Sequence, residues 1–241
     1  MTIAIIDGDV LLYQSMWGCV TIEEGQEKFK EVFDDAMESM FATDYVMALG
    51  GPDNFRLDIF PDYKGNRKKV KDSRPSWFGD LKSWIIDNYP GSILSDNCEA
   101  DDMVRVWATQ CKDSNIDFIV CSVDKDLNCI VGPHYNPRTR QILNISDNYA
   151  ERFYWEQILT GDSTDNIPGI HRCGPVKAKK ILENAFTRKE LQSAVCVAYK
   201  DSYQEHGYSH LISNSRLIHI WRYIDDYFKI TREFYDDAIK E

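Results

Sequence analysis

Three strand-sized apolar runs, separated by segments with helical patterning, constrain the fold of this chain most. The runs occupy residues 3–6, 45–49 and 116–122. Apolar side chains recur at helical spacing in residues 26–43, between the first two runs, and again in residues 100–111, before the third. Strands that alternate with helices in this way predict an α/β fold built on a parallel sheet.

Four clusters of acidic residues follow these runs or open predicted helices. The clusters hold Asp7; Glu99, Asp101 and Asp102; Asp124 and Asp126; and Asp162 and Asp165. Each cluster alone has a structural explanation, because acidic residues commonly cap helix N-termini. However, Asp7 and Asp124 follow strands whose carboxyl ends lie at one edge of the same sheet, which is where ligands bind. Carboxylates crowded there repel one another unless a cation is bound.

The chemistry of these clusters points to a hard metal ion. They contain no His or Cys, and oxygen ligands favour Mg²⁺ or Mn²⁺ over zinc. Two such ions about 4 Å apart can activate a water molecule and stabilise the leaving oxygen of a phosphodiester. The pattern therefore predicts hydrolysis of a phosphate ester. Asp9, two residues after Asp7, is assigned to the turn and receives no chemical role.

Two segments supply groups that bind phosphate. The first contains Tyr63, Lys64, Arg67, Lys68, Lys69 and Lys71. Its cations suit phosphate oxygens and its tyrosine suits stacking on a base, although a solvated charge run is the simpler alternative. The second contains Gly169, Gly174, Lys177 and Lys179. Backbone amides at a glycine turn that leads into a helix form an anion site, which suits a DNA backbone held without base readout.

Composition limits these interpretations without excluding them. The chain has 241 residues, a net charge of −11 and a pI near 4.9, whereas polyphosphate binding normally needs a basic face. Here the acidic residues gather in clusters that a divalent cation would neutralise, and the basic residues gather in short segments. Seven scattered cysteines indicate reduced core residues. Without a membrane-length apolar run or an export signal, we expect a cytoplasmic protein.

Five motifs, taken in order, resemble the signature set of the 5′-nuclease family, the flap endonucleases and 5′-3′ exonucleases. They read IIDGDVLLY, NFRLDIFPDYKGNR, CEADD, SVDKDL and GDSTDNIPGIHRCGPVKA, and they extend from residue 3 to about residue 182. The chain is most similar to the small bacteriophage exonucleases of this family, which would place it in the host-cell cytoplasm. The resemblance implies a PIN-like catalytic domain at residues 1–155, with a short basic arch at about 61–97. It also implies a helix-three-turn-helix subdomain with C-terminal helices at residues 156–241.

The resemblance also assigns roles to individual residues. It implies two Mg²⁺ ions, replaceable by Mn²⁺, held by the residues of the four acidic clusters: Asp7, Glu99, Asp101, Asp102, Asp124, Asp126, Asp162 and Asp165. Lys64 and Arg67 match the catalytic basic residues that activate the phosphate. The remaining matches contact DNA: Tyr63, Lys68, Lys69, Lys71, Gly169, Gly174, Lys177 and Lys179. In the family the glycine hairpin often holds a monovalent cation, here K⁺. The partner implied is DNA with a 5′ end or flap, or an RNA–DNA hybrid, bound by a monomer.

One departure from the family pattern concerns the end of the second predicted strand. The family carries a carboxylate there, where this chain has Leu49 and Gly50. The segment that would form the arch is short, which favours exonuclease action over the threading of single strands. The sequence does not separate exonuclease, flap-endonuclease and RNase H activity.

Three alternatives remain open at this stage. A haloacid-dehalogenase-type phosphatase would use Asp7 and Asp9 as nucleophile and acid/base, but it leaves two acidic clusters unexplained. A PIN-like ribonuclease shares the fold but lacks the glycine hairpin. A decayed DNA-binding module would account for the absent carboxylate, although the other acidic positions are retained.

Overall fold

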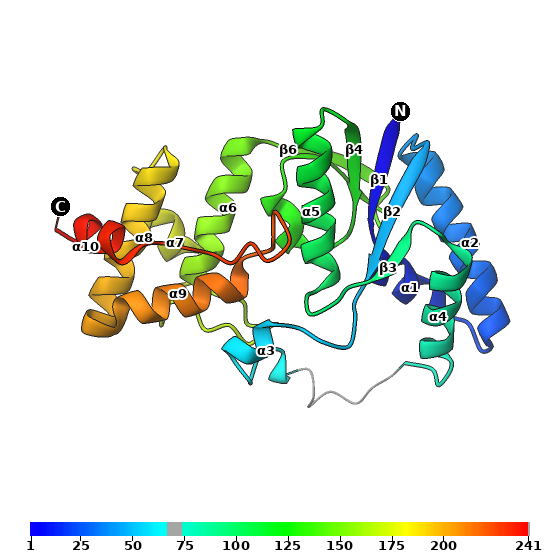
Figure 1. Ribbon diagram of the computed structural model, residues 1–241, viewed down its shortest axis with the longest axis horizontal. Helices are drawn as coiled ribbons and strands as arrows, with labels where there is room; N and C mark the ends of the chain where they lie inside the picture. Colours follow the sequence, from blue (N-terminus) through cyan, green and yellow to red (C-terminus); the bar gives the residue numbers. More distant parts are fainter. Residues whose placement is uncertain (67–73, 241) are drawn as a thin grey trace. The chain divides into compact units, whose positions relative to one another are not determined.

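The computed structural model describes residues 1–66 and 74–240 and divides into two compact units (Figure 1). Unit 1 comprises Met1–Asn54, Asp72–Ser146 and Ile220–Ile224, and unit 2 comprises Phe55–Lys71, Asp147–His219 and Asp225–Glu241. Acidic residues outnumber basic ones by about two to one in unit 1 but nearly balance them in unit 2. The negative charge of the chain is therefore concentrated in unit 1, so net charge says little about the surface of unit 2.

Unit 1 is built on a six-stranded sheet with the order β3-β2-β1-β4-β5-β6. Its strands are β1 (Thr2–Asp7), β2 (Asp44–Leu49), β3 (Ser92–Leu94), β4 (Asp117–Cys121), β5 (Gly132–Asn136) and β6 (Gln141–Ile145). The expected α/β class is confirmed. Five strands are parallel, as expected, and β6 runs antiparallel to β5 at one side, so the sheet is mixed.

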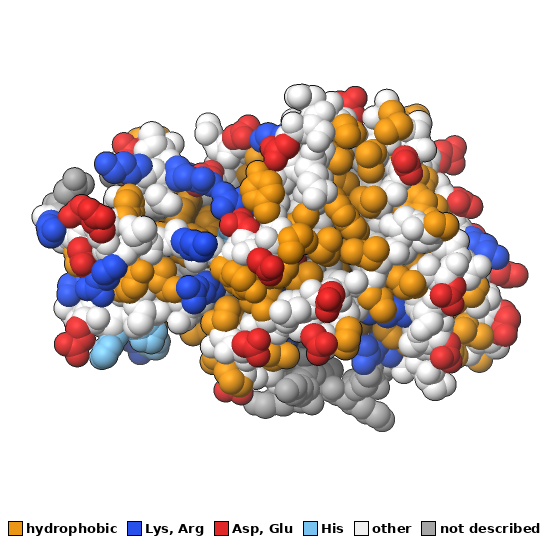
Figure 2. Space-filling model, in the orientation of Figure 1, with side chains coloured by type: hydrophobic (Ala, Val, Ile, Leu, Met, Phe, Trp, Pro, Cys, Tyr) orange, Lys and Arg blue, Asp and Glu red, His pale blue; other side chains and the backbone are white. Residues whose placement is uncertain are grey.

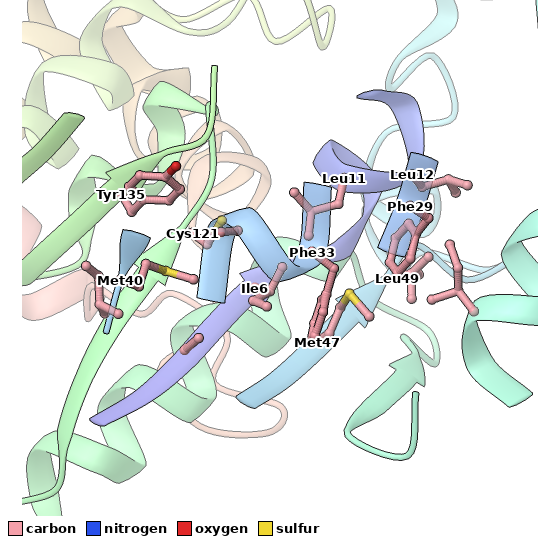
Figure 3. Close-up of a cluster of buried hydrophobic side chains, with 14 of the residues drawn as sticks. Ile6, Leu11, Leu12, Phe29, Phe33, Met40, Met47, Leu49, Cys121 and Tyr135 are labelled. Atoms are coloured by element: carbon pink, nitrogen blue, oxygen red, sulfur yellow. The ribbon is translucent and has the colours of Figure 1, made fainter. Parts of the chain in front are cut away.

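Helices pack on the sheet of unit 1. They are α1 (Gly8–Met16), α2 (Ile22–Ser39), α4 (Phe78–Asn88) and α5 (Ala100–Asp113), and the turn η2 (Lys125–Cys129) follows β4. Helix α5 packs against β1, β2 and β4. Side chains from α1, α2 and α4 meet the central strands in a core that includes Leu11, Phe29 and Met47 (Figure 3). The capping box that Thr21 and Glu24 form fixes where α2 begins.

The regular secondary structure described in unit 2 consists of helices and one isolated bridge, between Asp162 and Ile167. Its helices are α3 (Arg56–Ile59), α6 (Asp147–Thr160), α7 (Pro175–Ile181), α8 (Arg188–Tyr203), α9 (Gly207–Ile218) and α10 (Arg232–Ala238), with the short turn η3 (Gln204–His206) between α8 and α9. The expected domain boundary at residues 155/156 falls inside α6, whereas unit 2 takes in the whole of that helix and the segment Phe55–Lys71. On the face in Figure 2, Lys and Arg side chains gather over the helices of unit 2.

Buried polar groups anchor the helices of unit 2. Arg56 is almost fully buried and donates hydrogen bonds to the carbonyls of Leu217 (2.9 Å) and His219 (2.8 Å). The His219 ring lies between the Tyr154 hydroxyl at 3.1 Å and the Asp226 carboxylate at 3.2 Å. Buried charges require such partners, and here they tie the end of α9 to α3 and α6. No helix among the described residues is long and apolar enough to cross a membrane.

Candidate active site

Asp7 lies at the end of β1 and is a buried carboxylate at the sheet edge of unit 1. Its Oδ2 accepts a hydrogen bond from the Ser122 hydroxyl at 2.9 Å, and the Asp124 backbone N–H donates to that same hydroxyl at 3.0 Å. Ser122 therefore connects the end of β1 to the turn after β4, which brings two of the predicted site residues to one edge as the parallel register requires.

The environment of Asp7 disfavours its negative charge. Burial, followed by the charge of Asp9 and then that of Asp124, raises the pKa of Asp7 to about 7, although hydrogen bonds from Ser122 and the Val10 backbone oppose the shift. Only 5% of the Asp7 surface is exposed. A positive charge close to Asp7 would therefore stabilise its ionised form.

Asp9 is a site residue that the sequence interpretation left out. It lies in the first turn of α1, and its Oδ2 accepts a hydrogen bond at 3.1 Å from the N–H of Gly50, immediately after β2. The Lys82 ammonium of α4 lies 3.9 Å from Asp9 Oδ1 and also donates to the Gly50 carbonyl. The predicted position of Asp9 in a turn was wrong. The only sequence signal for these contacts was the acid-free end of β2, because 41 residues separate Asp9 from Gly50.

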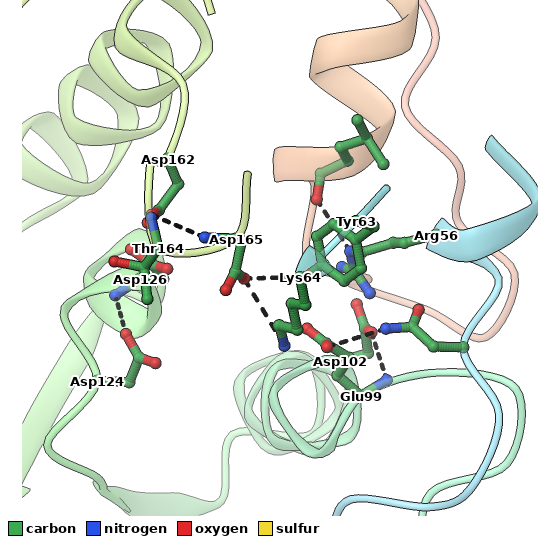
Figure 4. A network of polar contacts seen from close by, with 12 residues as sticks. Arg56, Tyr63, Lys64, Glu99, Asp102, Asp124, Asp126, Asp162, Thr164 and Asp165 are labelled. Atoms are coloured by element: carbon green, nitrogen blue, oxygen red, sulfur yellow. Dashed lines mark hydrogen bonds and ion pairs between the residues drawn. The ribbon is translucent and has the colours of Figure 1, made fainter. Parts of the chain in front are cut away.

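The acidic cluster at the start of α5 is partly structural (Figure 4). Glu99 and Asp102 form a capping box, in which Asp102 Oδ2 accepts from the Glu99 N–H at 2.9 Å. Asp102 Oδ1 accepts from the Trp221 N–H at 3.0 Å, and the residue has 0% exposure. Asp102 was predicted to bind metal, but both of its oxygens bind backbone amides, so the structure gives it a capping role instead. Glu99 accepts from the Asn54 amide at 2.9 Å, and Asp101 is half-buried.

The third cluster lies where η2 begins. Asp124 is exposed, and its Oδ1 accepts from the Asp126 N–H at 2.9 Å, which makes it the cap of η2. The cap orients the Asp124 carboxylate without burying it, so the outer face of the carboxylate stays accessible to solvent and ions.

The candidate ligands of unit 1 have the chemistry that a divalent cation such as Mg²⁺ requires. All of them are carboxylates, whose oxygens are the ligands that hard cations prefer. The surroundings of Asp7 disfavour its negative charge, and a bound cation would stabilise that charge. Within residues 1–66 and 74–240, no three His, Cys, Asp or Glu side chains already converge closely enough to hold an ion. Side-chain rotation at Asp124, Asp126 and Glu99 would therefore accompany binding.

In unit 2, the basic segment is attached to the fourth acidic cluster. The Lys64 ammonium lies 3.7 Å from Asp165 Oδ2, and the Lys64 N–H donates to the Asp165 carbonyl at 2.9 Å. Asn66 donates to the carbonyl of Ser163, and Asn166 donates to that of Asp62. These bonds hold residues 62–66 against residues 163–166, so Lys64 and Asp165 lie together as a pair of predicted site residues.

Tyr63 does not have the role that the sequence interpretation gave it. Its side chain is 3% exposed, and its hydroxyl donates to Asp165 Oδ2 at 3.0 Å. A ring buried in this way offers no face to a base, so the stacking prediction does not hold for this structure. The other predicted residues of the segment, Arg67, Lys68, Lys69 and Lys71, lie outside the described residues.

A loop closed by two glycines follows α6. Asp162 Oδ1 accepts from the N–H groups of Thr164 (2.6 Å) and Asp165 (3.3 Å), and Asp162 pairs with Ile167 in an isolated bridge. Gly161 and Gly169 both have positive φ and lie in contact, since a Cβ added to Gly169 would fall 2.3 Å from the Gly161 nitrogen. Glycine is therefore required at both positions.

The carbonyl of Gly169 faces the helices of unit 2 and has protein partners. The Tyr203 hydroxyl of α8 donates to it at 2.9 Å, and the Asn214 amide of α9 donates at 3.3 Å. The role of Gly169 in the structure is thus to close the hairpin, and any contact with DNA would come from the surface beyond it.

Helix α7 carries the basic residues of the hairpin. Gly174 is its N-cap, Pro175 occupies the first helical position, and Lys177 and Lys179 are exposed. A Cβ at Gly174 would meet nothing within 4 Å among the described residues, and its φ of −82° suits any residue. Gly174 is therefore not required by the fold in the way that Gly169 is.

Comparison with known proteins gives a consistent set of relatives. A family model described as the 5′-3′ exonuclease N-terminal resolvase-like domain matches residues 2–158. DNA polymerase I of Rhizobium leguminosarum is 31% identical over 138 residues, which cover 54% of this chain and 14% of that protein. Flap endonuclease Xni of Shewanella piezotolerans is 27% identical over 143 residues, 56% of each protein. The chain thus spans about half the length of the curated endonuclease relatives it matches first.

Solved structures resemble this chain in fold. The bacteriophage T5 flap endonuclease, solved as a pseudo-enzyme–product complex with DNA and metal ions, has a TM-score of 0.74 at 17% identity and covers 100% of this chain and 97% of its own. The T5 5′-exonuclease with bound zinc has a TM-score of 0.70 at 18% identity, with the same coverage. The catalytic core of Rad2 with a DNA substrate has a TM-score of 0.51 at 14% identity and covers 86% of this chain and 66% of its own. The PIN-like α/β fold is confirmed.

Proposed function

Since the chain belongs to the 5′-3′ exonuclease family through its N-terminal resolvase-like domain, we propose that it is a divalent-metal-dependent nuclease that cleaves DNA phosphodiester bonds from or near a 5′ end. The observation that carries this proposal is the grouping of carboxylates at the sheet edge of unit 1. There Asp7 is buried beside the charges of Asp9 and Asp124, in an environment that raises its pKa to about 7. A buried carboxylate with a raised pKa is typical of a functional site, and a bound cation would stabilise its ionised form.

The carboxylates of unit 1 would hold the metal. Asp7 and Asp124 supply oxygens from the ends of neighbouring strands, and Glu99, Asp101 and Asp126 supply them from α5 and η2. Bound Mg²⁺ lowers the pKa of a coordinated water and neutralises charge that develops on the phosphate oxygens. Ser122 holds the Asp7 carboxylate in place, whereas the side chains of Glu99, Asp124 and Asp126 would rotate to reach the ion.

Unit 2 would supply phosphate contacts. The ion pair with Asp165 holds the Lys64 ammonium at a defined position, from which it would contact a phosphate oxygen. Asp162 and Asp165 are the predicted ligands of a second ion. Lys177 and Lys179 project from α7, where they suit the backbone of duplex DNA. A K⁺ ion at the hairpin is part of the proposal.

The relatives suggest the substrate class. Flap endonuclease Xni is named for flap cleavage, and the T5 and Rad2 structures contain DNA. We assign this chain a DNA substrate with a free 5′ end, with RNA–DNA hybrids as an additional substrate and a monomer as the active form. Exonuclease action is preferred to threading of a flap, because the segment between Lys64 and α4 is short.

The test is digestion of linear duplex DNA labelled at the 5′ or the 3′ end, with Mg²⁺ or with EDTA, beside p-nitrophenyl phosphate. We expect short labelled products released only from the 5′ label and only with Mg²⁺. Turnover of p-nitrophenyl phosphate without DNA cleavage would establish the phosphatase alternative instead. Absence of both activities, with duplex binding retained, would identify a DNA-binding module that has lost catalysis.

A further inference from the structure

The strand ends of the unit 1 sheet are unequal in charge. Strand β1 ends in Asp7 and β4 is followed by Asp124, but β2 ends at Leu49 and is followed by two glycines. Neutral residues at the end of β2 would leave the side of the candidate site next to β1 and away from β4 without a carboxylate of its own. The side chain of Asp9 lies at this position.

Asp9 occupies the space that a side chain on Gly50 would fill. Its Oδ2 accepts from the Gly50 N–H at 3.1 Å, and a Cβ built on Gly50 would lie 2.9 Å from that same oxygen. Among the described residues, Asp9 is the only group within 4 Å of such a Cβ. The carboxylate therefore reaches the end of β2 from α1, and glycine at position 50 makes room for it.

Lys82 holds this arrangement from the other side. Its ammonium lies 3.9 Å from Asp9 Oδ1 and donates to the carbonyl of Gly50, so that the pair binds both polar groups of the Gly50 backbone. The side chains of Lys82 and Asp9 are 24% and 35% exposed, which leaves both within reach of ions from solvent. Neither is a core residue that packing alone explains.

From this geometry we propose that Asp9 supplies a carboxylate to the metal site at the end of β2, and that Lys82 is the counter-charge that pairs with Asp9 when no ion is bound. The inference rests on the proposed function. Its consequence is that the charge Asp9 adds to the site is partly balanced by Lys82, whose ammonium competes with a divalent cation for the same oxygens.

The first test is isothermal titration of the full chain with Mg²⁺ alone, which measures binding and needs no DNA. We expect Asp9→Asn to weaken Mg²⁺ binding by about tenfold or more, the size of effect seen when the environment of a metal is disturbed. Lys82→Met should tighten Mg²⁺ binding by about threefold, because it removes the competing ammonium. Asp80→Asn is the matched control: it removes one exposed carboxylate from the same helix as Lys82 and should leave Mg²⁺ affinity unchanged.

The second test removes the carboxylate of Asp9 and places one at residue 50, directly after β2. Asp9→Ala frees the space beside residue 50, so the double variant Asp9→Ala/Gly50→Asp should recover Mg²⁺ affinity to within about threefold of the wild type. Gly50→Asp alone should destabilise the protein, because its Cβ meets the Asp9 carboxylate. Circular dichroism establishes that each variant is folded before titration.

Wild-type affinity for Mg²⁺ in Asp9→Asn would overturn the proposal, and so would a folded double variant that fails to recover Mg²⁺ affinity. The outcome is separable from that of the proposed function. A wild-type chain that binds Mg²⁺ through Asp9 but cuts no DNA would refute the nuclease assignment alone. Mg²⁺-dependent cleavage with full Mg²⁺ affinity in Asp9→Asn would refute the role of Asp9 alone.

Discussion

Replacement of Asp7 by asparagine should stabilise the metal-free protein while it removes activity. Asparagine has nearly the same shape and can still accept the hydrogen bond from Ser122, but it carries no charge. The buried charge of Asp7 lies near Asp9 and Asp124, so its removal relieves both desolvation and repulsion. We therefore expect opposite effects on stability and on cleavage, the pattern typical of a functional carboxylate.

The size of the effect follows from the pKa. In the unfolded chain Asp7 ionises near 3.8, whereas in the folded protein it keeps its proton up to about 7. Between these values the folded state binds a proton that the unfolded state has lost, so stability falls as pH rises. The loss is about 2 kcal/mol at pH 5 and about 4 kcal/mol at pH 8, at 1.36 kcal/mol for each unit of pKa difference.

The assay is urea denaturation in EDTA at pH 5 and at pH 8, followed by circular dichroism. The Asp7→Asn variant should exceed the wild type in free energy of unfolding by about 2 kcal/mol at pH 5 and by about 4 kcal/mol at pH 8. Addition of Mg²⁺ should stabilise the wild type at pH 8 and leave the variant unchanged, because only the wild type retains the carboxylate.

An Asp7→Asn variant that is no more stable than the wild type at pH 8 in EDTA would refute this explanation. A gain that is equal at both pH values would also contradict it, since the predicted gain depends on ionisation of Asp7. The control is Asp80→Asn, an exposed position in the same unit, for which we expect no gain in the free energy of unfolding comparable to that of Asp7→Asn.

Three further predictions concern individual residues. Asp124→Ala should reduce Mg²⁺-dependent cleavage by at least about a hundredfold, yet leave duplex binding in Ca²⁺ unchanged; wild-type cleavage would exclude Asp124 from the site. Lys177→Ala should weaken duplex binding and lower the slope of log K against log salt by roughly one, and an unchanged slope would remove α7 from the DNA surface. Gly169→Ala should lower the free energy of unfolding, measured by urea denaturation, by about 2–4 kcal/mol, because φ at Gly169 is positive and the new Cβ would clash with the Gly161 backbone. Gly174→Ala should lower it by less than about 0.5 kcal/mol, and equal losses in the two variants would contradict the hairpin geometry.

The strands that could be predicted are those with buried apolar runs. Strands β1, β2 and β4 lie at the centre of the sheet and carry the hydrophobic pattern that indicated them. The three other strands gave no such signal. Strand β3 has only three residues, β5 contains glycine and proline, and four of the five residues of β6 are exposed. Pairing with neighbours, which is not local in sequence, creates these strands.

The candidate site could be predicted where its residues follow strands. Asp7 and Asp124 lie at the expected edge because parallel strands bring their ends together. The contacts of Asp9, Tyr63 and Asp102 could not be predicted, since they depend on partners far along the chain. An acidic residue at the start of a helix has the same appearance in sequence whether it caps or coordinates. Only the buried Trp221 amide distinguishes the two roles for Asp102.

The return of the chain to unit 1 at Ile220–Ile224 has a consequence for synthesis on the ribosome. The Trp221 amide satisfies the buried Asp102 carboxylate, and the Ile220 carbonyl accepts from Arg105 at 2.7 Å. Translation from Ser146 to Ile220 takes roughly 4–15 s at 5–20 residues per second, and during that time α5 lacks the Trp221 N–H that donates to Asp102 and the Ile220 carbonyl that accepts from Arg105. The nascent unit 1 would therefore lack these two hydrogen bonds until residues 220–224 have been synthesised. A fragment that stops at residue 146 should bind chaperones or proteases as an unfinished intermediate.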